Sequence, residues 1–151
     1  MIIYLGADHR GFKLKETLKE FLLSVSGGYE VVDLGAVSYE EGDDYPDFAA
    51  AVAEKISAQL ENKGILICGS GVGMDIVANK FTGVRSATAL SIDQVYSARH
   101  DDDVNILTLA ADFLDGDNIE KIVAIFVATP FAEEERYKRR LDKISKIESR
   151  N

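Results

Sequence analysis

The sequence of 151 residues contains little of several residue types, and each shortage excludes a class of protein. Its one cysteine, Cys68, excludes an intramolecular disulfide framework and a multi-cysteine metal site. A lone cysteine is typical of a reducing compartment, so we expect a cytoplasmic location. No apolar run approaches the roughly 20 residues that cross a bilayer, and the first residues lack the basic stretch of a signal peptide. We therefore expect no membrane partner.

Basic residues are also few, because 17 Lys and Arg stand against 26 Asp and Glu, for a net charge of -9. Nonspecific binding to nucleic acids or anionic membranes requires the opposite sign, so we expect no nucleic-acid partner. An anionic ligand would need local groups that attract it against this charge. Two basic clusters could do so, one near Arg10 and one between Arg136 and Arg140.

The pattern of apolar residues indicates one α/β domain over residues 1–151, with no linker or internal repeat. Hydrophobic residues make up 46% of the chain and charged residues 28%, which is typical of a globular protein. Short apolar runs predict strands over 2–6, 29–34, 65–68, 84–90 and 105–109. Amphipathic helical stretches follow each strand, and a charged C-terminal helix covers about 134–147. This alternation predicts a five-stranded parallel sheet covered by helices on both faces.

The polar residues that follow two of these strands indicate a ligand site. In an open parallel sheet, ligands bind beyond the carboxyl ends of the strands, where the winding direction reverses. A flavodoxin-like strand order would place that crevice between the loops after the first and third strands. The first of these loops carries Asp8, His9 and Arg10, and the second is the glycine-rich turn 69–73.

The glycine-rich turn and the cysteine before it each have a functional and a structural interpretation. The N–H groups around Gly69, Gly71 and Gly73 could bind a phosphate, carboxylate or enolate oxygen, or the segment is only a tight turn. It lacks the Gly-Lys-Ser/Thr ending of a P-loop and departs from the dinucleotide fingerprint. Cys68 faces a helix N-terminus, which favours a reactive thiolate, although a lone cysteine is commonly a small buried apolar residue.

The other candidate residues also have two interpretations. Asp8 could orient His9, or it could cap the following helix while His9 is a solvated loop residue. Arg136 and Arg140 share one helical face, which suits phosphate binding or simple solvation. The three carboxylates of 101–103 could bind Mg²⁺, but without further spaced ligands they indicate a solvated turn.

Together these residues resemble the ribose-5-phosphate isomerase B family, which also contains the galactose-6-phosphate isomerase subunits. The resemblance covers essentially the whole chain, and its most specific block surrounds Cys68. The matching segments are Gly-Ala-Asp-His-Arg-Gly-Phe at 6–12, Asp-Tyr-Pro-Asp-Phe-Ala at 44–49, Gly-Ile-Leu-Ile-Cys-Gly-Ser-Gly-Val-Gly-Met at 64–74, Ala-Asn-Lys at 78–80, Gly-Val-Arg at 83–85, Asn-Ile-Leu at 105–107, Thr-Pro-Phe at 129–131 and residues 136–141.

The resemblance implies a Rossmann-like three-layer α/β/α fold and a homodimer that often pairs further into a homotetramer. It also implies active sites at the dimer interface that need no metal and no organic cofactor. The reaction would be the aldose–ketose interconversion of a phosphosugar through a cis-enediolate. That chemistry requires a base that moves a proton between C1 and C2, an acid at the oxygens, an oxyanion site and a phosphate anchor.

Residue roles follow from the same resemblance. Cys68 would be the base, and Ser70 would assist at the hydroxyl oxygens. Asp8 and Tyr45 would contact the sugar. The N–H groups of Gly69, Gly71, Val72 and Gly73 would hold the enediolate. His9, Arg136 and Arg140 would help hold the phosphate, with the two arginines reaching in from the partner subunit. Arg10 is a further candidate for substrate binding.

The sequence departs from the family pattern before the fifth strand. The family commonly has His-Asn-x-x-Asn there, with the His opening the furanose ring and the first Asn holding the substrate. Without a gap, Asp101 and Asp102 occupy those positions, and His100 lies one residue early. We expect Asp101 at the ring-opening position, with His100 as the alternative, and we expect two adjacent carboxyl groups to repel a phosphosugar and raise each other's pKa. Tyr137 stands where the family tends to have a His.

The sequence thus predicts a phosphosugar aldose–ketose isomerase of the ribose 5-phosphate/ribulose 5-phosphate type, with Cys68 as base. One alternative is an isomerase of a different phosphosugar, because the ring-opening position is changed. Another is a non-catalytic phosphosugar- or nucleotide-binding protein that kept the fold. A flavodoxin-like signalling receiver is disfavoured, because Ala110-Ala111-Asp112 stands where a receiver has a lysine after its fifth strand.

Overall fold

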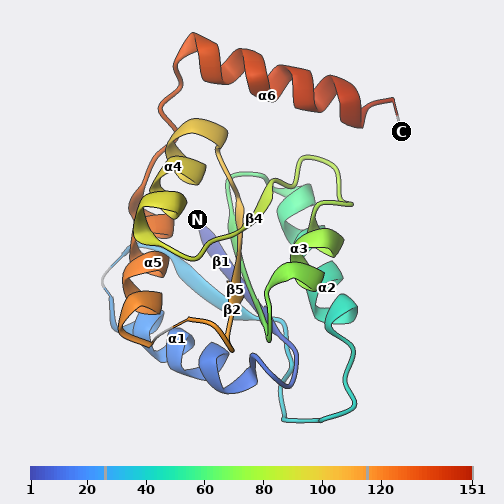
Figure 1. Cartoon of the computed structure of the whole chain (residues 1–151), viewed down its shortest axis with the longest axis vertical. Helices are drawn as coiled ribbons and strands as arrows, with labels where there is room; N and C mark the ends of the chain where they lie inside the picture. The colour runs from blue at the N-terminus through green and yellow to red at the C-terminus, as the bar shows by residue number, and fades with distance from the viewer. Residues whose placement is uncertain (26, 115, 151) are drawn as a thin grey trace.

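A parallel sheet forms the middle layer of the computed structural model, which describes residues 1–25, 27–114 and 116–150 (Figure 1). Helices cover both faces of the sheet, so the expected three-layer α/β/α arrangement is confirmed. The strands are β1 (Ile2–Ala7), β2 (Glu30–Asp33), β3 (Lys63–Cys68), β4 (Ser86–Thr88) and β5 (Ile106–Ala110). The helices are α1 (Phe12–Ser24), α2 (Tyr45–Ala58), α3 (Val72–Ala78), α4 (Ile92–Asp102), α5 (Gly116–Ala128) and α6 (Glu135–Glu148).

The strand order is β2-β1-β3-β5-β4, which differs from the flavodoxin-like order on one side. β5 lies beside β3, and β4 forms the edge. The reason is burial: all five residues of β5 are buried, whereas the three residues of β4 are only half-buried. The more apolar strand takes the interior place, as parallel sheets require. The reversal of winding between β1 and β3 is as expected.

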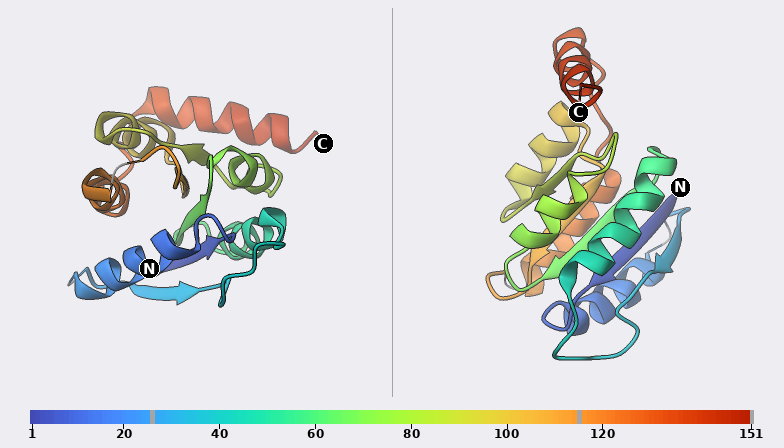
Figure 2. Two further views of the ribbon diagram at one scale, coloured as in Figure 1. Left: turned by 60° about the horizontal axis from the view of Figure 1, so that its bottom comes forward. Right: turned by 90° about the vertical axis from the view of Figure 1, so that its right-hand side faces the viewer.

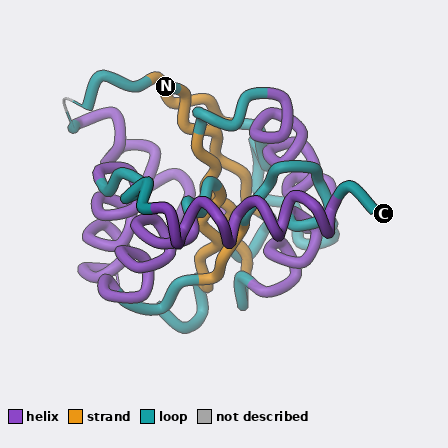
Figure 3. The backbone as a smooth tube through the Cα atoms, turned by 90° about the horizontal axis from the view of Figure 1, so that it is seen from above, coloured by secondary structure: helices purple, strands orange, loops and turns teal. Residues whose placement is uncertain are grey.

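Each face of the sheet has its own apolar core. Helices α1, α4 and α5 pack on one face and α2 and α3 on the other, as Figures 1 and 3 show. The strands alternate between the two cores, so that in β3 Ile65 and Ile67 face α1 and α5 while Leu66 and Cys68 face α2 and α3. Cys68 is therefore part of a core as well as the last residue of its strand.

Helix α6 lies apart from these layers. It crosses the end of the molecule where the central strands begin, as the views of Figures 2 and 3 show. Among its apolar residues, Tyr137 is buried against the body, whereas Ile144 is 49% exposed. Much of the apolar side of α6 is thus open to a partner or to solvent.

The fully buried Lys15 ties α1 to the loop that precedes α2. Its Nζ donates hydrogen bonds to both carboxylate oxygens of Asp33 at 2.7 and 2.6 Å, and to the carbonyl oxygen of Ala36 at 2.7 Å. Asp33 is largely buried, which alone would raise its pKa, but the hydrogen bonds from Lys15, the Gly35 N–H and Lys19 hold that pKa below its ordinary value. The start of the loop is therefore fixed by a saturated buried lysine.

Candidate active site

A hollow of about 640 Å³ lies beyond the carboxyl ends of β1, β3 and β5. It joins the loop after β1 to the glycine-rich turn after β3, so the expected meeting of these two loops is confirmed. Its volume suits a small-molecule ligand. The lining residues are Asp8, His9, Arg10, Tyr45, Cys68, Gly69, Ser70, Val72, Gly73, Ile76, Asp112 and Phe113.

The turn after β3 needs glycine at two places. Gly71 has a φ of +77°, and a Cβ there would lie 2.9 Å from Cγ2 of Thr88. A Cβ on Gly73 would lie 2.7 Å from Cζ of Tyr45, the first residue of α2. The turn is therefore pressed against β4 on one side and against the Tyr45 ring on the other, and this ring forms part of the wall.

Cys68 combines the two interpretations that the sequence left open. Its side chain is buried, with 4% of its surface exposed, yet it lines the hollow. The Gly71 N–H donates a hydrogen bond of 3.2 Å to Sγ. An N–H dipole aimed at sulfur stabilises negative charge there, as a nucleophilic or basic thiolate requires. Ser70, by contrast, is exposed, and it also lines the hollow.

Asp8 shapes the loop that follows β1. Its Oδ1 accepts hydrogen bonds from the N–H groups of Arg10 and Gly11, both at 3.0 Å, so it holds the turn just before α1 begins. Burial raises the pKa of Asp8 above its ordinary value, although the hydrogen bond from Gly11 opposes the shift. Asp8 therefore lines the hollow as a largely desolvated carboxyl group.

The two basic residues of this loop, His9 and Arg10, each have an aspartate from another loop beside them. Nδ1 of His9 lies 2.7 Å from Oδ1 of Asp43, which precedes α2. The Arg10 guanidinium forms an ion pair with Asp112, which follows β5. A Cβ on Gly69 would lie 2.6 Å from Nε of Arg10 and 2.8 Å from the Asp112 carboxylate, so this pair closes over the turn. The positive charge of Arg10, which the sequence offered for an anionic ligand, is thus already balanced by Asp112.

The other candidate residues form a second group, near the opposite end of the strands, where β5 begins. His100 and Asp101 precede the start of β5, whereas Cys68 pairs with the last residue of that strand. Four strand residues, about 13 Å, separate these two ends. A single described chain therefore does not bring Asp101, Arg136 or Arg140 to the hollow that contains Cys68.

Within this second group the side chains contact one another. Nδ1 of His100 lies 2.6 Å from Oδ1 of Asp101, and its ring stacks on Tyr96 with centroids 5.2 Å apart. The guanidinium groups of Arg136 and Arg140 lie 4.5 and 5.7 Å from the centroid of the Tyr137 ring. Arg136 also donates a hydrogen bond of 2.6 Å to the Tyr137 hydroxyl. The Tyr137 ring thus contacts both arginines.

The expectation that adjacent carboxyl groups raise each other's pKa is wrong for Asp101. Its hydrogen bond with His100 lowers the pKa, and a hydrogen bond with Tyr137 adds to the effect. Asp102 does not share this environment, because it lines a different hollow with Arg85 and Ile144 under α6. Successive residues of a helix point about 100° apart, so the two carboxylates face different surroundings.

Sequence reasoning missed Asp43, Asp112 and two apolar residues of the wall, Ile76 and Phe113. Asp112 follows β5 at the same edge as Cys68, so the rule that selected the first two loops would have selected it once β5 was placed beside β3. Asp43 stands in an acidic loop, and no sequence pattern predicts that this loop folds back onto His9.

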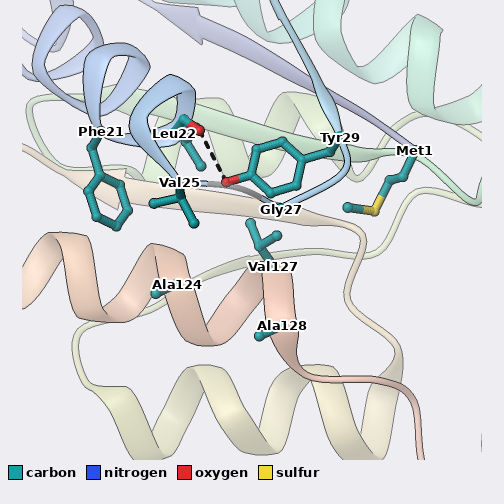
Figure 4. Close-up of a pocket in the computed structure, with 9 residues that line it drawn as sticks. All are labelled: Met1, Phe21, Leu22, Val25, Gly27, Tyr29, Ala124, Val127 and Ala128. Atoms are coloured by element: carbon teal, nitrogen blue, oxygen red, sulfur yellow. Dashed lines mark hydrogen bonds between the residues drawn. The ribbon is translucent and has the colours of Figure 1, made fainter.

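A second cavity, of about 300 Å³, lies between the end of α1 and α5 and has an apolar wall (Figure 4). The hydroxyl of Tyr29 in this wall donates a hydrogen bond of 3.2 Å to the Leu22 carbonyl oxygen and does not point at a ligand. The described lining therefore offers a phosphate no partner. Across residues 1–25, 27–114 and 116–150, no group of three or more His, Cys, Asp or Glu side chains is placed to hold a metal ion. None of the helices described has the length and apolar character to cross a membrane.

Comparison with known proteins gives matches over nearly the full chain. The model of the ribose/galactose isomerase family matches residues 3–144. A Mycoplasma genitalium protein named probable ribose-5-phosphate isomerase B is 42% identical over 148 residues, 97% of this chain and 95% of its own length.

Solved structures match equally far. The crystal structure of ribose-5-phosphate isomerase B from Mycoplasma genitalium with bound ribulose-5-phosphate has a TM-score of 0.93 and 38% identity, over 99% of this chain and 97% of that one. The type B ribose 5-phosphate isomerase from Trypanosoma cruzi has a TM-score of 0.95 and 35% identity, over all of both chains.

Proposed function

Because this chain belongs to the ribose/galactose isomerase family, we propose that it interconverts ribose 5-phosphate and ribulose 5-phosphate or a closely similar pair of phosphosugars. The coarser class, a sugar-phosphate isomerase, follows from the family model and the full-length relatives. The observation that best supports the finer proposal is the hollow that contains Cys68, the glycine-rich turn and the loop of Asp8.

In the proposed reaction, the Cys68 thiolate removes the proton from C2 of the open-chain aldose and returns it to C1. The electron pair released at C2 forms the enediolate, and a proton passes between O2 and O1 with the help of the Ser70 hydroxyl. The N–H groups of the 69–73 turn hold the negative oxygen. The Gly71 N–H, at 3.2 Å from Sγ, stabilises the thiolate before the first transfer and again after the second, whereas between them the sulfur holds the proton as a neutral thiol.

The phosphate requires cations that one chain does not supply. Arg10 is paired with Asp112, and the wall also contains Asp8, so a phosphate dianion meets no free permanent cation in the described hollow. Arg136 and Arg140 lie near the start of the strands and are both exposed, and Arg136 forms an ion pair with Glu134 of its own helix region at 2.7 Å. We propose that a second copy of the chain brings its Arg136 and Arg140 to this hollow, in a homodimer.

Exposed apolar residues on the rim of the hollow support this assembly. The side chains of Val72, Ile76 and Phe113 are 53%, 57% and 76% exposed in the isolated chain. A cluster of this kind is typical of a surface that a partner covers. Pairing of two such dimers into a tetramer stays a prediction.

Ring opening falls in this proposal to His100 and Asp101 of the partner subunit. The lowered pKa makes the Asp101 carboxylate a weak base, and its oxygen accepts the hydrogen bond from Nδ1–H of His100. His100 then presents Nε2 as the proton-transferring atom, and Asp101 fixes the ring. Asp102 is outside this pair, because it faces the hollow under α6.

A direct assay tests the function. Purified protein is incubated in D₂O with ribose 5-phosphate and with other pentose and hexose phosphates, and deuterium at C1 and C2 is followed by NMR. We expect exchange and isomerisation with ribose 5-phosphate. Because Asp101 stands where the family has His, turnover confined to another phosphosugar would favour the alternative substrate. Thermal stabilisation by these ligands without exchange in any of them would refute the isomerase and favour a binding protein.

A further inference from the structure

The loop between β2 and α2, residues 34–44, reaches back to the loop that follows β1. It lies beside the blue loop of β1 at the foot of Figure 1 and in the right-hand view of Figure 2. The N–H of Ala7 donates to the carbonyl oxygen of Gly35, and the N–H of Ala36 donates to that of Ala7, both at 2.8 Å. Together with Lys15, these bonds fix one end of the segment, and α2 fixes the other at Tyr45.

This segment delivers Asp43 to His9. Oδ1 of Asp43 accepts a hydrogen bond from the His9 main-chain N–H at 3.0 Å and lies 2.7 Å from Nδ1 of the same residue. The Asp43 side chain is only 9% exposed. In the described part of the chain, its buried Oδ2 has no hydrogen-bond partner. An acceptor left unsatisfied in this way lowers stability, so the position calls for an explanation beyond folding.

The contact decides which nitrogen of His9 is available to a ligand. A carboxylate oxygen can only accept, so Nδ1 carries the hydrogen and Nε2 is the atom left for the hollow that His9 lines. The Tyr39 ring stands edge-on to the imidazole, with centroids 6.2 Å apart. Asp8 is a second carboxyl group close enough to interact electrostatically with His9.

We propose that Asp43 is a positioning residue for His9: it fixes the Nδ1–H form of the imidazole, so that Nε2 faces the phosphate group of the substrate. The inference rests on the proposed function for the identity of the ligand. When Nε2 is protonated and donates a hydrogen bond to a phosphate oxygen, the Asp43 carboxylate on the other side of the ring balances the positive charge of the imidazolium. Asp43 itself does not touch the substrate.

The first measurement needs no substrate. Imidazole ¹⁵N shifts of the intact labelled protein are recorded at a pH where His9 is neutral, and the two histidines are distinguished with His9→Gln. We expect a hydrogen on Nδ1 and a bare Nε2 for His9. Asp43→Ala should shift His9 toward the Nε2–H form that free imidazole prefers, and Asp43→Asn, which keeps an acceptor oxygen, should restore the Nδ1–H form. An Nε2–H form in the wild-type protein would overturn the proposal even if Asp43→Ala does not fold.

The second measurement uses inorganic phosphate as the probe, titrated while the His9 signals are followed. We expect the dissociation constant to rise roughly tenfold in Asp43→Ala, the effect of one charge-assisted hydrogen bond. In isomerase assays, KM should rise by a similar factor and kcat should change less than threefold. Glu41→Ala is the matched control, because it removes an exposed carboxylate from the same loop, and both values should stay at wild type.

The outcomes separate this inference from the proposed function. An Asp43→Ala protein with wild-type His9 shifts and wild-type phosphate affinity would refute the positioning role. Loss of kcat with unchanged KM would also contradict it. If His9 and phosphate respond as expected but no phosphosugar is isomerised, the proposed function fails while the role of Asp43 stands.

Discussion

Replacing the buried Lys15 with methionine tests how the fold supports the site. Methionine fills a similar volume but leaves the Asp33 carboxylate, 13% exposed, with Lys19 as its remaining cationic partner at 2.9 Å. Removing one partner of a buried pair costs about 3–5 kcal/mol. Since Lys19 still compensates Asp33, we expect the low end, about 3 kcal/mol, which is a fall in Tm of roughly 10 °C for a domain of this size.

Urea unfolding at pH 7 measures this effect, at one protein concentration because an oligomer unfolds in a concentration-dependent way. Lys13→Met, on the exposed side of α1, is the control and should change stability by less than about 0.5 kcal/mol. The pKa of Asp33 is lowered, so its stabilising contribution is present above pH 3.8 and lost as the pH falls through the lowered value. The difference between wild type and Lys15→Met should therefore shrink below pH 4. A loss under 1 kcal/mol at pH 7 would refute the structural role of Lys15.

Three further changes test other parts of the structure. Burial lowers the pKa of Lys63 to about 8, so between pH 8 and 10.5 the unfolded chain binds more protons than the folded one, and the free energy of unfolding should rise by about 3 kcal/mol over that range. Lys63→Met should abolish this rise in urea titrations. An unchanged rise in the variant would contradict the burial of the ammonium group. Gly73→Ala places a methyl group 2.7 Å from the Tyr45 ring, so kcat/KM should fall about tenfold and stability by about 1 kcal/mol, and wild-type kinetics would mean that Tyr45 is not part of the site. Asp112→Asn frees the Arg10 guanidinium, so the KM for a phosphosugar should fall roughly threefold, whereas a higher KM would show that Asp112 helps to bind the sugar.

The sequence predicted the fold well because its signals are local. A strand that is buried on both faces is apolar throughout, as 65–68 is, and a helix that is buried on one face has apolar residues at helical spacing. The structure confirms the strands and helices that these patterns predict. The strand order needed more, since the exchange of β4 and β5 depends on which strand is buried on both faces. The same error concealed Asp112, which lies at the site only because β5 is next to β3.

The site was predictable where it follows a strand and unpredictable where it depends on contacts between loops. Cys68 ends a buried strand and Asp8 follows one. Because ligands bind beyond the carboxyl ends of parallel strands, both residues are expected at the same site. The pairing of His9 with Asp43 joins residues 34 apart in the sequence, through a loop whose course is set by Lys15. The lowered pKa of Asp101 also depends on a contact between helices, because the Tyr137 hydroxyl comes from α6.

Proton exchange by a Cys68→Ala variant tests the central claim most directly, because no other described residue of the hollow is proposed to carry the proton between C1 and C2. Wild-type protein and variant are incubated in D₂O with the phosphosugar that the wild type isomerises, and thermal stabilisation by that ligand confirms that the variant still binds it. We expect the variant to bind the ligand and to incorporate deuterium at least about a hundredfold more slowly at C2 of the aldose and C1 of the ketose. Exchange at the wild-type rate in Cys68→Ala would show that another group is the base.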